Sequence, residues 1–115
     1  MMGTKRFLIA GGSSGIGLEI VKALHEKGNE IYVGSRTKEQ LADLSGVRHL
    51  PLDVTEDPLN LEGLPDVLNG MVYCPGTIRL KPFQRLTIDD FLEDLQINFL
   101  GAISTIQACL TRLRK

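Results

Sequence analysis

Three glycines near the N-terminus have the spacing of a loop that binds phosphate. Gly11, Gly15 and Gly17 directly follow the apolar run Arg6–Ala10, and a helical pattern of apolar residues begins immediately after them. Glycine lets the backbone turn sharply and approach a pyrophosphate closely, and the free N–H groups at a helix N-terminus attract negative charge. An ordinary turn between a strand and a helix also contains glycine. The loop therefore indicates phosphate binding only where its context supports that function.

The other residue types that often do chemistry are scattered along the chain. The two histidines and the two cysteines are too far apart in sequence to predict a metal site. His49 lies in or next to a predicted strand, where a histidine is more often structural than a base or a ligand. The carboxylates between residues 89 and 94 also have a structural explanation, because acids are favoured in the first turns of a helix.

Hydrophobic periodicity predicts an alternation of strands and helices that would position the glycine loop. Short apolar runs typical of buried strands occur at Arg6–Ala10, Glu30–Gly34, Val47–Leu52 and, within Val67–Tyr73, around Met71–Tyr73. Helical patterns cover Ser14 to about Lys27, a short stretch ending at Leu44, and a long segment that is capped by Thr87, kinked near Asn98 and ends at about Arg114. Proline and glycine leave room for at most a short helix in residues 53–66.

This order of elements predicts the fold class. Strands that alternate with helices imply right-handed βαβ units and a parallel sheet. We expect one α/β domain, residues 1–115, with a Rossmann-like parallel sheet of strand order 3-2-1-4 and flanking helices. The glycine loop would then lie at the switch point of the sheet, where such folds bind nucleotides.

Four short segments carry a resemblance to a known family. They are Gly11-x-x-x-Gly15-x-Gly17, Leu52-Asp53-Val54, Val72-Tyr73-Cys74-Pro75-Gly76 and Ile97-Asn98-Phe99. In order and spacing the chain resembles the N-terminal half of a short-chain dehydrogenase/reductase, over essentially all 115 residues. That family usually has threonine in place of Ala10 and two asparagines in place of Tyr73-Cys74. Since both sides of one polar contact have changed together, we expect an apolar or backbone-only contact there.

The resemblance implies that this half binds a nicotinamide cofactor. Asp53 would meet the adenine ring with Val54 beside it, and Gly76 would line the nicotinamide ribose with Cys74 nearby. The pyrophosphate side would be held by Gly11, Ser13, Ser14, Gly15, Ile16 and Gly17. The family moves hydride between nicotinamide and a small carbonyl or alcohol, and Asn98 is the only member of its catalytic set in this sequence.

Charge at the end of the second strand predicts which cofactor is bound. Sites specific for NAD place an acidic residue there, but this chain has Ser35 and Arg36. An arginine fork and a serine hydroxyl can bind a 2′-phosphate, which a carboxylate would repel. We therefore expect NADP rather than NAD. The alternative is that Arg36 simply opens a solvated helix.

The catalytic Tyr-x-x-x-Lys pair of the family does not occur in this sequence. Tyr32 and Tyr73 are the only tyrosines, and Arg36 and Thr77 stand four positions after them. We expect a truncated, cofactor-binding part of an oxidoreductase that is inactive alone. The alternative is a non-catalytic nucleotide-binding or interaction module. A methyltransferase-type Rossmann domain fits less well, because it usually has another glycine spacing and an acid closing the second strand.

Composition and patterning set the remaining expectations. A net charge of −1 does not suggest a nucleic acid or an anionic membrane as a partner. No apolar run approaches the ~20 residues of a membrane span, and no signal peptide is evident, so a cytoplasmic location with reduced cysteines is expected. The long helix has a wide apolar face and the fourth strand lies at an edge of the expected sheet, which together predict a homo-oligomer.

Overall fold

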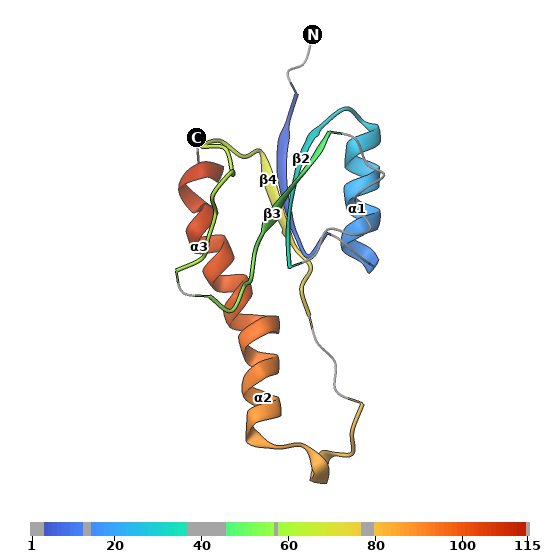
Figure 1. Ribbon diagram of the computed structural model, residues 1–115, viewed down its shortest axis with the longest axis vertical. Helices are drawn as coiled ribbons and strands as arrows, with labels where there is room; N and C mark the ends of the chain where they lie inside the picture. Colours follow the sequence, from blue (N-terminus) through green and yellow to red (C-terminus); the bar gives the residue numbers. More distant parts are fainter. Residues whose placement is uncertain (1–3, 13–14, 37–45, 57, 77–79, 115) are drawn as a thin grey trace.

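A four-stranded parallel sheet forms the centre of the molecule (Figure 1). The computed structural model describes residues 4–12, 15–36, 46–56, 58–76 and 80–114. Its strands are β1 (Arg6–Ala10), β2 (Glu30–Ser35), β3 (Val47–Pro51) and β4 (Gly70–Tyr73). They are ordered β3-β2-β1-β4, and every pairing is parallel. The predicted Rossmann-like order is therefore confirmed, with strand ends close to those expected.

One face of the sheet is covered by helix α1 (Gly15–Glu26) (Figure 1). The helix buries Leu18 and Val21, and Val21 packs with Ile9 and Val33 in one cluster. The helix ends where expected, because Gly28 takes a φ of 83° and donates its N–H to the carbonyl of His25 at 3.0 Å. A glycine in this left-handed conformation is the usual C-terminal stop of a helix.

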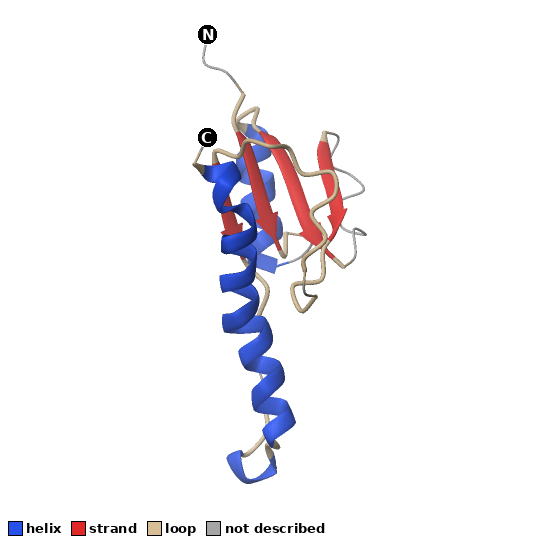
Figure 2. Ribbon diagram, turned by 90° about the vertical axis from the view of Figure 1, so that its left-hand side faces the viewer, coloured by secondary structure: helices blue, strands red, loops and turns tan. Residues whose placement is uncertain are grey.

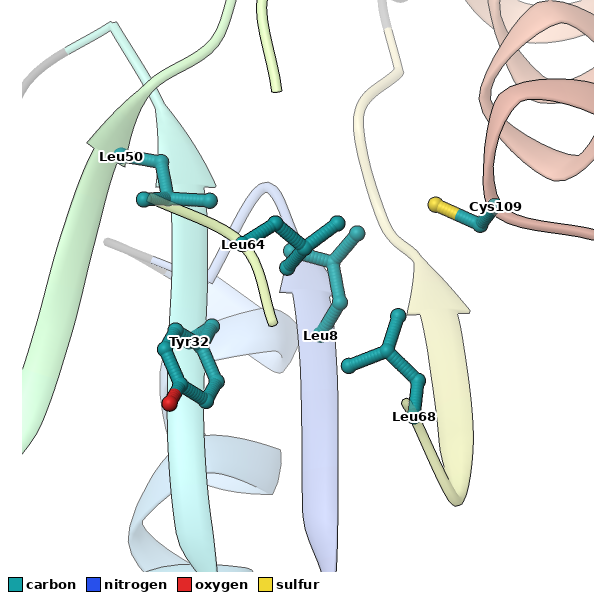
Figure 3. Close-up of a cluster of buried hydrophobic side chains, with 6 residues drawn as sticks. All are labelled: Leu8, Tyr32, Leu50, Leu64, Leu68 and Cys109. Atoms are coloured by element: carbon teal, nitrogen blue, oxygen red, sulfur yellow. The ribbon is translucent and has the colours of Figure 1, made fainter. Parts of the chain in front are cut away.

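The opposite face is covered by helix α3 (Gly101–Leu113) and by the segment that precedes β4. Figure 3 shows the buried side chains that join these parts, which are Leu8, Tyr32, Leu50, Leu64, Leu68 and Cys109. Arg112 fastens the end of α3 to the preceding segment, since its Nε donates to the carbonyl of Pro65 at 3.0 Å. The sheet is thus buried on both faces, as its continuous apolar strands predict.

The long C-terminal helix is built from three pieces. They are α2 (Ile88–Leu95), a π-helical turn η3 (Gln96–Leu100) and α3, and the rod they form runs well past the end of the sheet (Figure 2). Thr87 caps α2 in a reciprocal capping box with Asp90, as the sequence predicts. The kink expected near Asn98 is this π turn, in which the N–H of Gly101 donates to the carbonyl of Gln96.

Other expectations have mixed outcomes. The short helix expected to end at Leu44 lies outside the described residues. A 3-10 turn, η2 (Phe83–Arg85), precedes α2 and has no counterpart in the sequence-based prediction. In the described part of residues 53–66 the chain forms turns and no helix. Both cysteines are free thiols. No helix among the described residues has the length and apolar character needed to cross a membrane.

Candidate functional site

A pocket of about 520 Å³ opens at the carboxyl ends of the strands. Parallel α/β sheets bind their ligands at this edge, in the crevice beside the switch point of the strand order. Six of the predicted site residues line the pocket, namely Gly11, Ser35, Arg36, Asp53, Val54 and Gly76. The sequence reasoning did not assign its other lining residues, which are Gly34, Leu52, Thr55, Pro75 and Ile97.

The glycine loop leaves no room for a side chain at Gly11 or Gly17. Gly11 takes a φ of 77° and donates its N–H to the carbonyl of Gly34 at 2.8 Å. A methyl group added to Gly11 would lie 2.8 Å from the backbone nitrogen of Pro75, and one added to Gly17 would overlap the carbonyl oxygen of Gly11. The start of α1 therefore packs directly on the loop, and a helix N-terminus in such a position can bind an anion.

The remaining predicted residues of the loop lie beside the helix start or outside the described chain. Gly15 takes a φ of 57° and lines a second, more open hollow along α1 together with Ile16. The Ile16 side chain is 79% exposed. Ser13 and Ser14 lie outside the described residues.

Polar residues follow the ends of β2 and β3 at the pocket. Ser35 is buried and Arg36 is exposed beside it. The Asp53 carboxylate oxygen Oδ1 accepts from the backbone N–H of Thr55 at 2.9 Å and from its hydroxyl at 2.6 Å. These two bonds, aided by the positive charge of Arg36, hold the pKa of Asp53 below its ordinary value. Near neutral pH the pocket thus carries a fixed carboxylate and an arginine.

The end of β1, just before the glycine loop, contacts the end of β4 through a backbone hydrogen bond and through apolar packing. The N–H of Cys74 donates to the carbonyl of Ala10 at 2.8 Å. Tyr73 also packs against the apolar cluster that contains Ala10, so the apolar or backbone contact expected from the changes at Ala10 and Tyr73-Cys74 includes both kinds of contact. The Cys74 side chain is half-buried and is not part of the pocket lining. Burial raises the pKa of its thiol, which keeps it protonated at neutral pH.

Tyr73 makes a contact that sequence reasoning missed. Its hydroxyl donates to the carbonyl of Ile97 at 2.6 Å, within the π turn η3. Gly101 makes room for it, because a methyl group there would overlap the Tyr73 hydroxyl oxygen. Burial raises the pKa of Tyr73, so the phenol remains a hydrogen-bond donor. The only signal in the sequence is a glycine inside the long helix, four residues after Ile97.

Asn98 is not among the residues that line the pocket, but it lies next to Gly76, which does line it. A methyl group added to Gly76 would be 3.1 Å from the Asn98 side-chain oxygen, so the two predicted residues are neighbours. Asn98 itself is exposed and follows Ile97 in the same π turn. The described residues contain no cluster of histidine, cysteine and carboxylate side chains that could hold a metal ion.

Comparison with known proteins identifies a consistent set of relatives. The family model for short chain dehydrogenases matches residues 5–115. An uncharacterised oxidoreductase of Bacillus subtilis (strain 168), DltE, is 48% identical over 109 residues, covering 84% of this chain and 43% of that protein. Two solved structures share the fold. NADPH-bound carbonyl reductase from chicken fatty liver has a TM-score of 0.87 at 23% identity, covering 100% of this chain and 50% of that one.

The second structure carries the other nicotinamide cofactor. It is a short-chain dehydrogenase from Leptospira borgpetersenii with bound NAD⁺, with a TM-score of 0.81 at 22% identity, covering 90% of this chain and 44% of that one. The structural neighbours thus include proteins bound to either cofactor. The chain spans about half the length of the curated relatives it matches.

Proposed function

The chain belongs to the short-chain dehydrogenase family, and we propose that residues 1–115 form the cofactor-binding part of an oxidoreductase that uses NADP(H). The observation that carries this proposal is the pocket, which brings Gly11, Ser35, Arg36 and Asp53 together at the carboxyl edge of the sheet. A dinucleotide site needs hydrogen-bond donors for the phosphates, a ribose site and a base site along one crevice. In this proposal Gly11 belongs to the phosphate site, Ser35 and Arg36 to the ribose site, and Asp53 to the base site.

The proposed binding mode follows the pocket from the glycine loop outwards. The loop and the start of α1 hold the pyrophosphate, with Gly11 to Gly17 contributing backbone N–H groups. Asp53 and Val54 face the adenine, and Gly76 lines the nicotinamide ribose with Cys74 behind it. Thr55 orients the Asp53 carboxylate through the two hydrogen bonds that it donates.

The preference for NADP rests on the charges at the end of β2. Arg36 lines the pocket next to the buried Ser35, and β2 ends without the acidic residue that would bind the ribose hydroxyls of NAD. An arginine can bind a phosphate through two parallel charge-assisted hydrogen bonds. A 2′-phosphate is therefore the group that this end of the pocket suits best.

The proposed reaction is hydride transfer between the nicotinamide and a small carbonyl or alcohol. The cofactor supplies the hydride, and Asn98 would support the proton donor at the nicotinamide end of the pocket. The Tyr-x-x-x-Lys pair of the family does not occur in the sequence, so we propose that these residues bind the cofactor without turning it over. The pair would have to come from another segment of the whole protein.

Replacement of Arg36 by aspartate tests the cofactor assignment. We expect Arg36→Asp in the full-length protein to raise the dissociation constant of NADPH by about ten- to a hundredfold, because hydrogen bonds to a charged group contribute ~1.5–3 kcal/mol. NADH binding, measured by the same fluorescence titration, should weaken little. Arg85→Asp is the matched control, since Arg85 is exposed on η2 and does not line the pocket. Unchanged NADPH affinity in Arg36→Asp would contradict the proposal.

A further inference from the structure

The hydrogen bond from Tyr73 to the long helix ends on a particular carbonyl of the π turn η3. In a regular α-helix the N–H of Gly101 would donate to the carbonyl of Ile97, four positions earlier. Here it donates instead to the carbonyl of Gln96, five positions earlier. The carbonyl of Ile97 accepts from the Tyr73 hydroxyl at 2.6 Å. Tyr73 therefore supplies a donor to the carbonyl from which the π turn removes the helical donor.

The surroundings of the Tyr73 hydroxyl are suited to this bond. Tyr73 is the last residue of β4, and it packs against the apolar cluster that contains Ala10 and Val54. A methyl group at Gly101 would overlap the hydroxyl oxygen, so the glycine gives the hydroxyl access to the helix backbone. The bond is thus made between packed groups, and it fixes the end of β4 to one point of the long helix.

The π turn forms one side of the pocket end that contains Gly76. Ile97 and Gly76 both line the pocket. A methyl group at Gly76 would lie 3.1 Å from the side-chain oxygen of Asn98, the residue after Ile97. Gly76 itself comes three residues after Tyr73 along the chain. Through its hydroxyl, Tyr73 therefore joins the segment that carries Gly76 to the turn that carries Asn98.

We propose that Tyr73 is a positioning residue for the nicotinamide end of the pocket. It acts through the π turn, by holding the Ile97 carbonyl and so keeping Ile97 and Asn98 in place beside Gly76. The inference rests on the proposed function, because it concerns the same pocket. It holds equally for NADP and for NAD, since the two cofactors share the nicotinamide.

Loss of the Tyr73 hydroxyl should loosen this end of the pocket. A carbonyl that loses its donor favours a return to the regular helical pairing, in which Ile97 accepts from Gly101. That change would shift Ile97 and Asn98 relative to Gly76. A cofactor would then have to restore the turn on binding, and the apparent dissociation constant rises as the competent fraction of the protein falls.

Two ligands that differ in the nicotinamide half test this role. They are NADP and 2′-phosphoadenosine 5′-diphosphate, which lacks the nicotinamide and its ribose. Calorimetry gives both dissociation constants for the full-length wild type and for Tyr73→Phe. We expect Tyr73→Phe to weaken NADP binding by about three- to tenfold, the usual effect of one lost hydrogen bond. Binding of the fragment should change less than about twofold, because its contacts lie away from the π turn.

Tyr32→Phe is the matched control. It also removes a tyrosine hydroxyl that donates to a neighbour, in this case Glu30, but Tyr32 does not line the pocket. Both affinities should therefore stay within about twofold of the wild type. Hydrogen exchange followed by mass spectrometry gives a second readout without ligand. Exchange in peptides covering residues 96–102 should be faster in Tyr73→Phe and unchanged in Tyr32→Phe.

The outcomes separate this inference from the proposed function. A wild-type protein that binds neither NADP nor NAD would overturn both. If the wild type prefers NAD, the pair of NAD and ADP makes the same comparison. If the wild type binds its cofactor but Tyr73→Phe keeps that affinity, or weakens cofactor and fragment equally, only the role of Tyr73 is overturned. Unchanged exchange of residues 96–102 in Tyr73→Phe would overturn that role as well.

Discussion

The contact of Tyr73 with the π turn predicts that substitutions at Tyr73 and Gly101 have strongly coupled effects on stability. The two residues are far apart in sequence but lie next to each other in the structure. Tyr73→Phe removes the donor to the Ile97 carbonyl, which lies at 2.6 Å. We expect it to lower the free energy of unfolding by about 1–2 kcal/mol, since a partly buried carbonyl loses its partner. Gly101→Ala should gain ~1 kcal/mol of helix propensity. However, its methyl group would overlap the Tyr73 hydroxyl and lie 3.0 Å from the Gln96 carbonyl.

The steric overlap with the Tyr73 hydroxyl should cost more than the gain in helix propensity. With both effects included, Gly101→Ala alone is expected to lower the free energy of unfolding by about 1–2 kcal/mol. In the Tyr73→Phe background the oxygen is absent and the ring edge stands one bond further back. Gly101→Ala should then be close to neutral. The expected coupling energy between the two sites is therefore about 1–2 kcal/mol.

The wild type, Tyr73→Phe, Gly101→Ala and the double variant form a double-mutant cycle. Urea unfolding followed by far-ultraviolet circular dichroism gives the free energy of unfolding of each, provided that the slope m stays constant. Thr111→Ala is the control, because Thr111 is an exposed residue of α3 and should add independently to Tyr73→Phe. Additive effects of Tyr73→Phe and Gly101→Ala, within about 0.5 kcal/mol, would refute the reasoning that the glycine is there to admit the hydroxyl.

Two further predictions concern the rim of the sheet and the long helix. The pKa of Glu30 is lowered from its ordinary 4.5, chiefly by the Tyr32 hydroxyl and then by Arg6. Its contribution to stability is therefore present above about pH 4.5 and lost as the pH falls through the folded-state value. Thermal unfolding midpoints between neutral and acid pH should fall more steeply in the wild type than in Glu30→Gln, and identical profiles would contradict this. The exposed apolar side chains of the long helix, such as Leu92, Phe99 and Ile106, predict a homo-oligomer. Light scattering should show Leu92→Glu shifted towards monomer, and a wild type that is already monomeric at high concentration would overturn the expectation.

The sequence predicts the fold well because its signals are local. Each strand is a short apolar run, and Gly28 and Thr87 mark a helix end and a helix start. Parallel pairing and right-handed crossovers then leave few arrangements of four strands. The π turn is only partly predictable, since the pattern indicates a kink near Asn98 without its cause.

The sequence predicts those pocket residues that local patterns mark, namely the glycines, the residues that end β2 and the Asp53-Val54 pair after β3. The glycines at 11 and 17 are required by close approach, which spacing alone can indicate. The contacts of His49 with Ser35 and of Tyr73 with Ile97 join residues 14 and 24 positions apart. They depend on strand register and on the rotation of the long helix, neither of which periodicity determines. Pro75 and Ile97 were not predicted to line the pocket, because their positions depend on the same two features.

At Ala10 and Tyr73 the glycine loop is joined to β4 by apolar packing and by the backbone, without a polar side-chain contact between these two residues. The backbone bond from Cys74 to Ala10 now joins the glycine loop to β4. This leaves the Tyr73 side chain available to hold the long helix through Ile97, a residue that itself lines the pocket. At the other end, His49 holds Ser35 across the β2–β3 pair. The two contacts share no residue, so Ile97 and Ser35, which both line the pocket, are each held by a separate side chain.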